Sequence, residues 1–101
     1  MGQFVRVART SELAPGRGMV VTVANTEIAL FNVAGRFYAI NNLCRHEGGP
    51  LGEGDLDDCV VTCPWHGWQY NVTTGKNDAE PSVCVESYPV RVQGDEVQVE
   101  I

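Results

Sequence analysis

Long apolar runs, a helical repeat and an excess of basic side chains are all missing from this sequence of 101 residues. No apolar run approaches the roughly 20 residues that a bilayer-spanning helix needs. The first ten residues, MGQFVRVART, lack the apolar stretch of a secretion signal. We therefore expect a cytoplasmic protein without a membrane partner.

Basic side chains are few, because 7 Lys and Arg stand against 13 Asp and Glu, for a formal net charge of −6. Nucleic acids are bound through a basic face that neutralises phosphates. We therefore expect no nucleic-acid partner. The acidic run of residues 53–58 is either a solvated loop or a docking surface for a basic reductase.

No segment keeps the 3.6-residue spacing of a helix, and no internal repeat is found. Apolar side chains instead alternate with a period of two. This pattern predicts a strand at residues 4–7, and three strands within residues 19–40 with turns near Asn25–Thr26 and Ala34–Gly35. Alternation on both sides of Gly94–Asp95 predicts a final two-residue hairpin. The sequence therefore indicates an all-β fold.

The centre of the chain has a different character. Residues 41–58 are rich in Gly, Asn, Asp and Pro and carry almost no core-forming pattern. A short strand, CVVTC, then leads into the segment CPWHGWQYNV and a further loop. We expect a β framework at both ends of the chain to support functional loops in the middle.

Both histidines of the chain lie beside cysteines, in the patterns Cys44-x-His46 and Cys63-x-x-His66. Single histidines and cysteines are usually structural, but this double pairing in two loops indicates a metal. One possibility is a tetrahedral Zn²⁺ site. The other is a [2Fe–2S] cluster with two cysteines on one iron and two histidines on the other.

Longer motifs around these pairs carry a resemblance. The segments CRHEGGPLGEG and CPWHGWQYNVTTG, followed by SYPVRVQGDEVQVEI, resemble the Rieske-type ferredoxins and oxygenase domains over nearly the whole chain. The resemblance implies one Rieske [2Fe–2S] domain over residues 1–101, built of stacked antiparallel sheets. It also implies a cluster-binding subdomain at approximately 42–82, inserted into a basal β framework of 1–41 and 83–101.

The same resemblance implies the ligands of the cluster. Cys44 and Cys63 would bind the inner iron, and His46 and His66 the outer, more exposed one. The remaining cysteines, Cys59 and Cys84, are expected to be buried thiols on strands, because disulfides are rare in a reducing cytosol.

Departures from the respiratory members of the family indicate a Rieske centre of low potential. Gly49 and Trp65 stand where those proteins carry a disulfide, and Trp68 replaces a serine whose hydroxyl bonds a cluster sulfide. Tyr70 remains as a second hydroxyl donor, and Trp65 is expected to lie nearer the surface than Trp68. Fewer donors to sulfur predict a potential near the low end of the roughly −150 to +300 mV range of Rieske centres.

These features favour a one-electron carrier that is not itself an enzyme. With both histidines used by the cluster, none remains for a mononuclear iron site. The resemblance implies that a flavin-containing reductase donates the electrons and that a terminal ring-hydroxylating oxygenase accepts them. Two alternatives remain: a small Rieske-like subunit of an assimilatory nitrite reductase, and a zinc-bound structural or interaction module.

Overall fold

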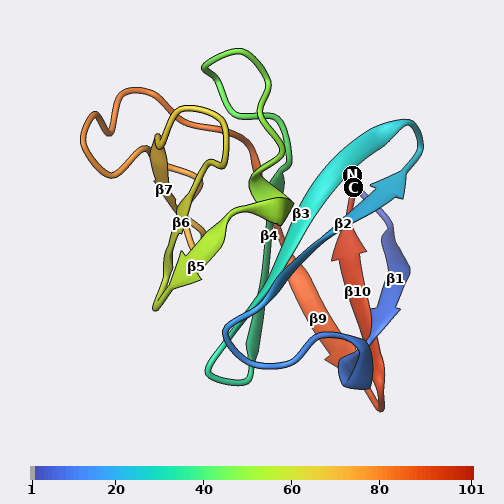
Figure 1. Cartoon of the computed structure of the whole chain (residues 1–101). Helices are drawn as coiled ribbons and strands as arrows, with labels where there is room; N and C mark the ends of the chain where they lie inside the picture. The colour runs from blue at the N-terminus through green and yellow to red at the C-terminus, as the bar shows by residue number, and fades with distance from the viewer. Residues whose placement is uncertain (1) are drawn as a thin grey trace.

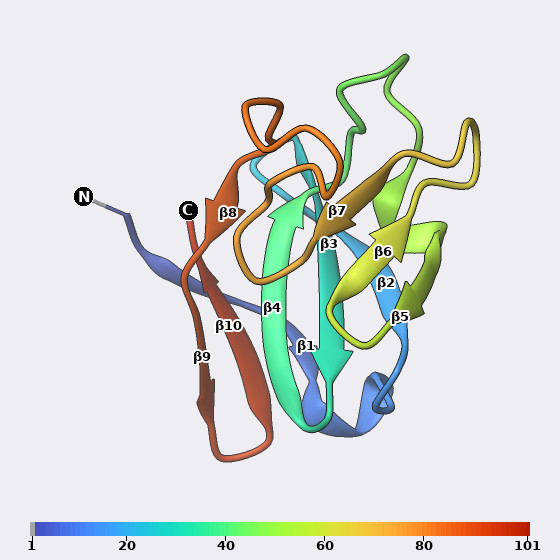
Figure 2. The same cartoon turned by 90° about the vertical axis from the view of Figure 1, so that its left-hand side faces the viewer.

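Three antiparallel sheets make up the computed structural model, which describes residues 2–101 (Figures 1 and 2). The sheets have the orders β1-β10-β9, β2-β3-β4-β8 and β5-β6-β7. The strands are β1 Phe4–Arg9, β2 Gly18–Val23, β3 Thr26–Val33, β4 Arg36–Asn41, β5 Asp55–Asp57, β6 Val60–Thr62, β7 Gln69–Asn71, β8 Ser87–Tyr88, β9 Val90–Gln93 and β10 Glu96–Glu100. Two 3-10 turns accompany them, η1 Thr10–Glu12 and η2 Leu51–Glu53. The predicted all-β fold of stacked antiparallel sheets is confirmed.

Tight turns join the hairpins where the sequence predicted them. Between β2 and β3, Ala24 and Asn25 have φ values of 49° and 67°. Between β3 and β4, Ala34 and Gly35 have φ values of 52° and 92°. Two consecutive positive φ values match the twist of paired strands, which is why such turns are favoured in hairpins. Gly94, with a φ of 63°, opens the turn between β9 and β10.

Strand β3 is buried on both faces and separates two hydrophobic cores. Ile28 and Leu30 face one core, whereas Ala29 and Phe31 face the other, because successive side chains of a strand point to opposite sides. The first, the framework core, comprises Ala8, Leu13, Ile28, Leu30, Ala39, Val97 and Val99. The second, the site core, comprises Ala29, Phe31, Ile40, Cys44, Leu51, Val61, Cys63, Tyr70, Val72 and Val85.

The small sheet β5-β6-β7 lies against the site core, beside the end of β4 (Figures 1 and 2). The segments that follow β4 and that join β6 to β7 project from the same end of the molecule, which both views show. These segments contain both Cys–His pairs. Within residues 2–101 no helix has the length and apolarity that crossing a membrane requires.

Candidate metal centre

The first Cys–His pair lies on a loop that backbone hydrogen bonds close on itself. The N–H of Cys44 donates to the carbonyl of Gly49 at 2.9 Å, and the N–H of Gly48 donates to the carbonyl of Cys44 at 2.9 Å. Gly48 has a φ of 74°, which glycine adopts without steric cost. We call residues 44–49 the first loop.

The second pair lies on a loop with the same two bonds. The N–H of Cys63 donates to the carbonyl of Trp68 at 2.7 Å, and that of Gly67 donates to the carbonyl of Cys63 at 3.1 Å. Gly67, with a φ of 78°, takes the place that Gly48 has in the first loop. Residues 63–68, the second loop, therefore repeat the two closing hydrogen bonds and the glycine of the first, although His66 lacks the positive φ of Glu47.

Both thiols of these loops are buried in the site core, with Cys44 3% and Cys63 2% exposed. A Cβ atom added to Gly49 would lie 2.5 Å from the Cys63 Sγ, so the first loop passes directly over that sulfur. Burial raises the pKa of the Cys44 thiol, and the neighbouring Cys63 adds to the rise. The structure therefore brings the two predicted sulfur donors together, in a buried place where an uncompensated thiolate charge is disfavoured.

The imidazoles of His46 and His66, one from each loop, lie in contact with each other. The ring centroids of His46 and His66 are 4.5 Å apart, with the planes at 75°. His46 also stacks on Trp68 at 4.7 Å and 16°. Among residues 2–101, the Nδ1 atom of His46 is a buried side-chain atom without a hydrogen-bond partner. Such an atom is costly unless it is a ligand, so the donor set fits a metal group.

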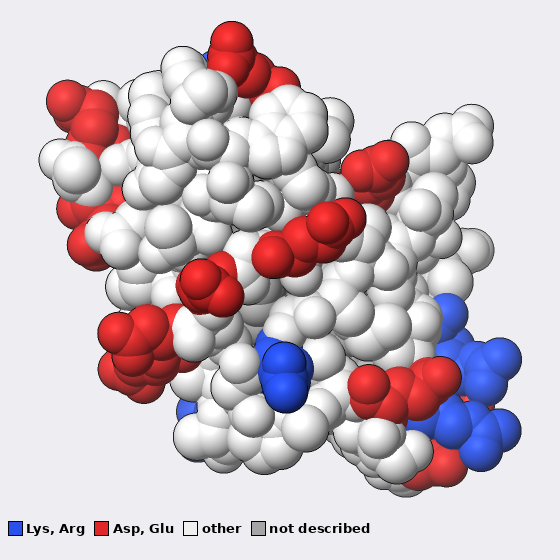
Figure 3. All heavy atoms as spheres, viewed as in Figure 1, with Lys and Arg blue, Asp and Glu red and all other residues white. Residues whose placement is uncertain are grey.

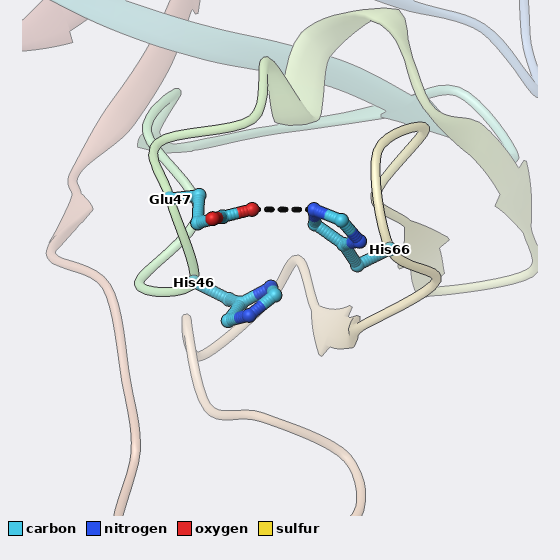
Figure 4. A group of neighbouring side chains, drawn as sticks. All are labelled: His46, Glu47 and His66. Carbon is cyan, nitrogen blue, oxygen red and sulfur yellow. Dashed lines mark hydrogen bonds and ion pairs between the residues drawn. The ribbon is translucent and has the colours of Figure 1, made fainter.

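Glu47 completes the arrangement at the exposed end (Figure 4). Its carboxylate Oε1 lies 2.5 Å from the Nε2 of His66, and the dashed line in the figure marks this contact. The donor atoms of His46, Glu47 and His66 all lie within 4.8 Å of one another. Sequence reasoning did not select Glu47, although its place directly after a candidate ligand is a usable signal.

Tyr70 supplies a hydroxyl to the sulfur side of the site. The side chain is fully buried, and its hydroxyl lies 3.4 Å from the Cys44 Sγ and accepts a bond from the Arg45 N–H at 3.1 Å. Burial, with the Cys44 contact, raises the pKa of Tyr70 to about 12. The hydroxyl therefore keeps its proton at neutral pH and can donate to sulfur, as the sequence predicted.

The two tryptophans differ in exposure as expected. Trp65 is 56% exposed, whereas Trp68 is half-buried against His46. A Cβ atom on Gly49 would lie 3.3 Å from the Cβ of Trp65. This separation is close to that of a disulfide. The two positions named as the missing clamp therefore do face each other.

The prediction for the other two cysteines was partly wrong. All four cysteines are free thiols, but Cys84 is exposed and Cys59 only half-buried, and neither lies within a strand. Cys59 follows the turn residue Asp58, whose φ is 56°. Cys84 precedes Val85, whose side chain enters the site core, so the extended backbone turns the Cys84 side chain outward.

Two loops that each join one thiol and one imidazole on an all-β framework define a metal-binding class of protein. Residues 3–89 match the family described as the Rieske [2Fe-2S] domain, and the chain belongs to that family. This match confirms the predicted resemblance and the type of cofactor, and it sets aside the zinc module.

Relatives narrow the assignment to the ferredoxins. The alkene monooxygenase ferredoxin component of Xanthobacter autotrophicus is 34% identical over 98 residues, covering 96% of this chain and 80% of that protein. The naphthalene 1,2-dioxygenase ferredoxin component of Pseudomonas aeruginosa is 33% identical over 91 residues, covering 89% and 88%. A solved carbazole 1,9a-dioxygenase ferredoxin from Nocardioides aromaticivorans IC177 has a TM-score of 0.89 at 34% identity, covering 96% of each chain. The prediction of an electron-transfer component, and not a catalytic enzyme, is confirmed.

Proposed function

We propose that Cys44 and Cys63 bind one iron of a [2Fe–2S] cluster and that His46 and His66 bind the other. The observation that carries this proposal is the unpartnered, buried Nδ1 of His46 at a site with two buried thiols. Two thiolates leave the oxidised cluster formally neutral, whereas four would leave it negative, so histidine ligation makes reduction easier.

The division of the chain into two parts belongs to the same proposal. Residues of approximately 42–82 form the cluster-binding subdomain, and residues 1–41 and 83–101 form the basal framework. Two observations support it: the sheet β5-β6-β7 and both loops fall within 42–82, and the framework core draws on residues outside that range.

The protein acts as a one-electron carrier between two larger partners. A flavin-containing reductase supplies the electron, and a terminal ring-hydroxylating oxygenase receives it. A solved complex of reduced oxygenase and oxidized ferredoxin in carbazole 1,9a-dioxygenase supports the second partner, since the matched chain is 32% identical with a TM-score of 0.88. The His66 side chain, 47% exposed, offers a short route for the electron to a docked partner. None of the four cysteines, all within residues 2–101, forms a disulfide, which supports a cytoplasmic location as part of the proposal.

A second candidate is a small subunit of a nitrite reductase. A proposed NADH-dependent nitrite reductase small subunit from Mycobacterium tuberculosis has a TM-score of 0.91, but only 25% identity. The ferredoxin assignment is favoured because relatives at 33–34% identity are ferredoxin components.

Metal analysis and electron paramagnetic resonance test the proposal. We expect two irons per chain and a Rieske-type signal after reduction with dithionite. Cys63→Ser removes a sulfur donor and should abolish the visible colour, whereas the matched control Cys59→Ser should retain it. Stoichiometric zinc in the wild type, or a full cluster spectrum in the Cys63 variant, would contradict the ligand assignment.

A further inference from the structure

We propose that Glu47 is a positioning residue, which holds the imidazole of His66 through Nε2 and lowers the reduction potential of the cluster. This inference rests on the proposed function, because it concerns the same site. It gives a role to a side chain that is not one of the four proposed ligands.

The hydrogen bond settles which nitrogen of His66 is free. The carboxylate of Glu47 engages Nε2 at 2.5 Å, and Nδ1 is the ring nitrogen left for a metal (Figure 4). His46 offers the same atom, its buried and unpartnered Nδ1. A carboxylate on the second nitrogen of a ligating histidine fixes the ring and makes it a stronger donor. Each histidine thus keeps Nδ1 available and has a neighbour that holds its ring, Glu47 for His66 and the stacked Trp68 for His46.

The backbone at Glu47 is a second, independent observation. Its φ is 65°, in the left-handed region that is uncommon for residues other than glycine, and Gly48 follows with 74°. A glycine at position 47 would relieve this conformation. A long acidic side chain at a strained position next to a ligand points to a function of that side chain.

The surroundings leave the negative charge of Glu47 directed at the histidine. Within residues 2–101, the imidazole of His66 is the charged-group partner of the Glu47 carboxylate, and no Lys or Arg lies within 4.0 Å of that carboxylate. The neighbouring Arg45 instead donates to the Cys84 carbonyl at 3.4 Å. A carboxylate on an iron ligand favours the more positive, oxidised state, so the centre is harder to reduce.

The test compares the reduction potentials of the cluster-loaded wild type and Glu47→Gln. Glutamine keeps the shape and an acceptor oxygen but removes the charge. We expect the equilibrium to move about tenfold toward the reduced form, a rise of about 59 mV for one electron. Glu53→Gln is the matched control, because Glu53 is an exposed carboxylate on the following turn η2. An unchanged potential in Glu47→Gln, or an equal rise in the control, would overturn the proposal.

Glu47→Gly guards against a folding artefact, since glycine suits the φ of this position. We expect an unchanged or higher melting temperature together with a rise in potential at least as large as that of Glu47→Gln. Loss of iron from both variants would assign Glu47 to cluster assembly and overturn its role in the potential. A wild type without a reversible one-electron reduction would instead refute the proposed function itself.

Discussion

Side chains of the metal centre fall into a buried part, which holds the thiols, and an exposed part, which holds His66 and Glu47. Cys44 and Cys63 are 3% and 2% exposed, whereas the side chains of His66 and Glu47 are 47% and 61% exposed. Hydrogen bonds to sulfur act on the buried part, whereas solvent and partner proteins can reach the exposed part. The potential of a Rieske centre depends on both, through bonds to the sulfurs and through the imidazoles.

Removal of the Tyr70 hydroxyl tests whether a hydrogen bond in the buried part of the centre affects the potential. Tyr70→Phe loses the donor 3.4 Å from the Cys44 Sγ, and a donor to sulfur stabilises the reduced state. We expect the reduction equilibrium to move about tenfold toward the oxidised form, which lowers the potential by about 59 mV for one electron. Protein film voltammetry measures the change, with the half-buried Tyr38→Phe as the control. A potential that rises or stays constant in Tyr70→Phe would show that this bond does not stabilise the reduced centre.

At this scale the spacing of the four candidate donors was specific enough to indicate one site, where the structure does bring them together, and the resemblance indicated Tyr70. It did not predict Glu47, since the bond to His66 depends on how two loops 19 positions apart meet in space. It was wrong about Cys84 because exposure there follows from which face Val85 occupies. Burial of a single residue outside a regular strand cannot be derived from a local pattern.

Among the elements, strand β3 contributes fully buried side chains from its two faces to two separate cores. Leu30 is fully buried in the framework core, on the opposite face from Phe31 in the site core. A defect on the Leu30 face should therefore weaken the fold without altering the metal centre.

Leu30→Ala tests this separation. Truncation of a fully buried leucine costs about 2–5 kcal/mol of unfolding free energy, from lost burial and the remaining cavity. We expect that loss in denaturant titrations, together with an unchanged reduction potential. Val92→Ala, at a side chain 47% exposed, should change the unfolding free energy by less than about 0.5 kcal/mol. A shift in potential in Leu30→Ala would show that the two cores are coupled.

The long hairpins were predictable, and so was the short strand β6, which lies within the predicted segment CVVTC, whereas β5 and β8 were not predicted. Strands β2, β3 and β4 have six to eight residues, and each of their two turns contains one residue suited to positive φ, Asn25 or Gly35. In contrast, β5 reads Asp-Leu-Asp, and β8 has two residues. Such short segments carry too little alternation, and their pairing depends on neighbouring strands that the sequence does not identify.

Charge is unevenly distributed over the molecule. Residues 42–82 contain seven acidic and two basic side chains, whereas the framework contains six acidic and five basic ones. Figure 3 shows acidic side chains spread over the face that it draws, including the side that carries β5, whereas the basic ones lie in its lower part, beside further acidic side chains. The excess of acidic over basic side chains thus falls in the part of the chain that holds the metal centre.

This asymmetry predicts that electron transfer from a basic reductase falls as salt rises, because salt screens the attraction between exposed charges. Stopped-flow reduction across an ionic-strength series measures it. Asp57→Lys, an exposed side chain on β5, should slow association several-fold at low salt. Asp95→Lys, in the distant β9–β10 turn, makes the same charge change and should have a smaller effect. Equal effects of the two variants would exclude a localised docking face.

The matching backbone bonds of the two loops have a consequence for the speed of the carrier. Each loop is closed by its own N–H and carbonyl groups, so the donors are held by the polypeptide and not by the metal alone. We expect loops closed in this way to change little in shape when the charge of a bound cluster changes. The nuclear rearrangement that accompanies electron transfer would then be small, which would lower the intrinsic barrier in both directions.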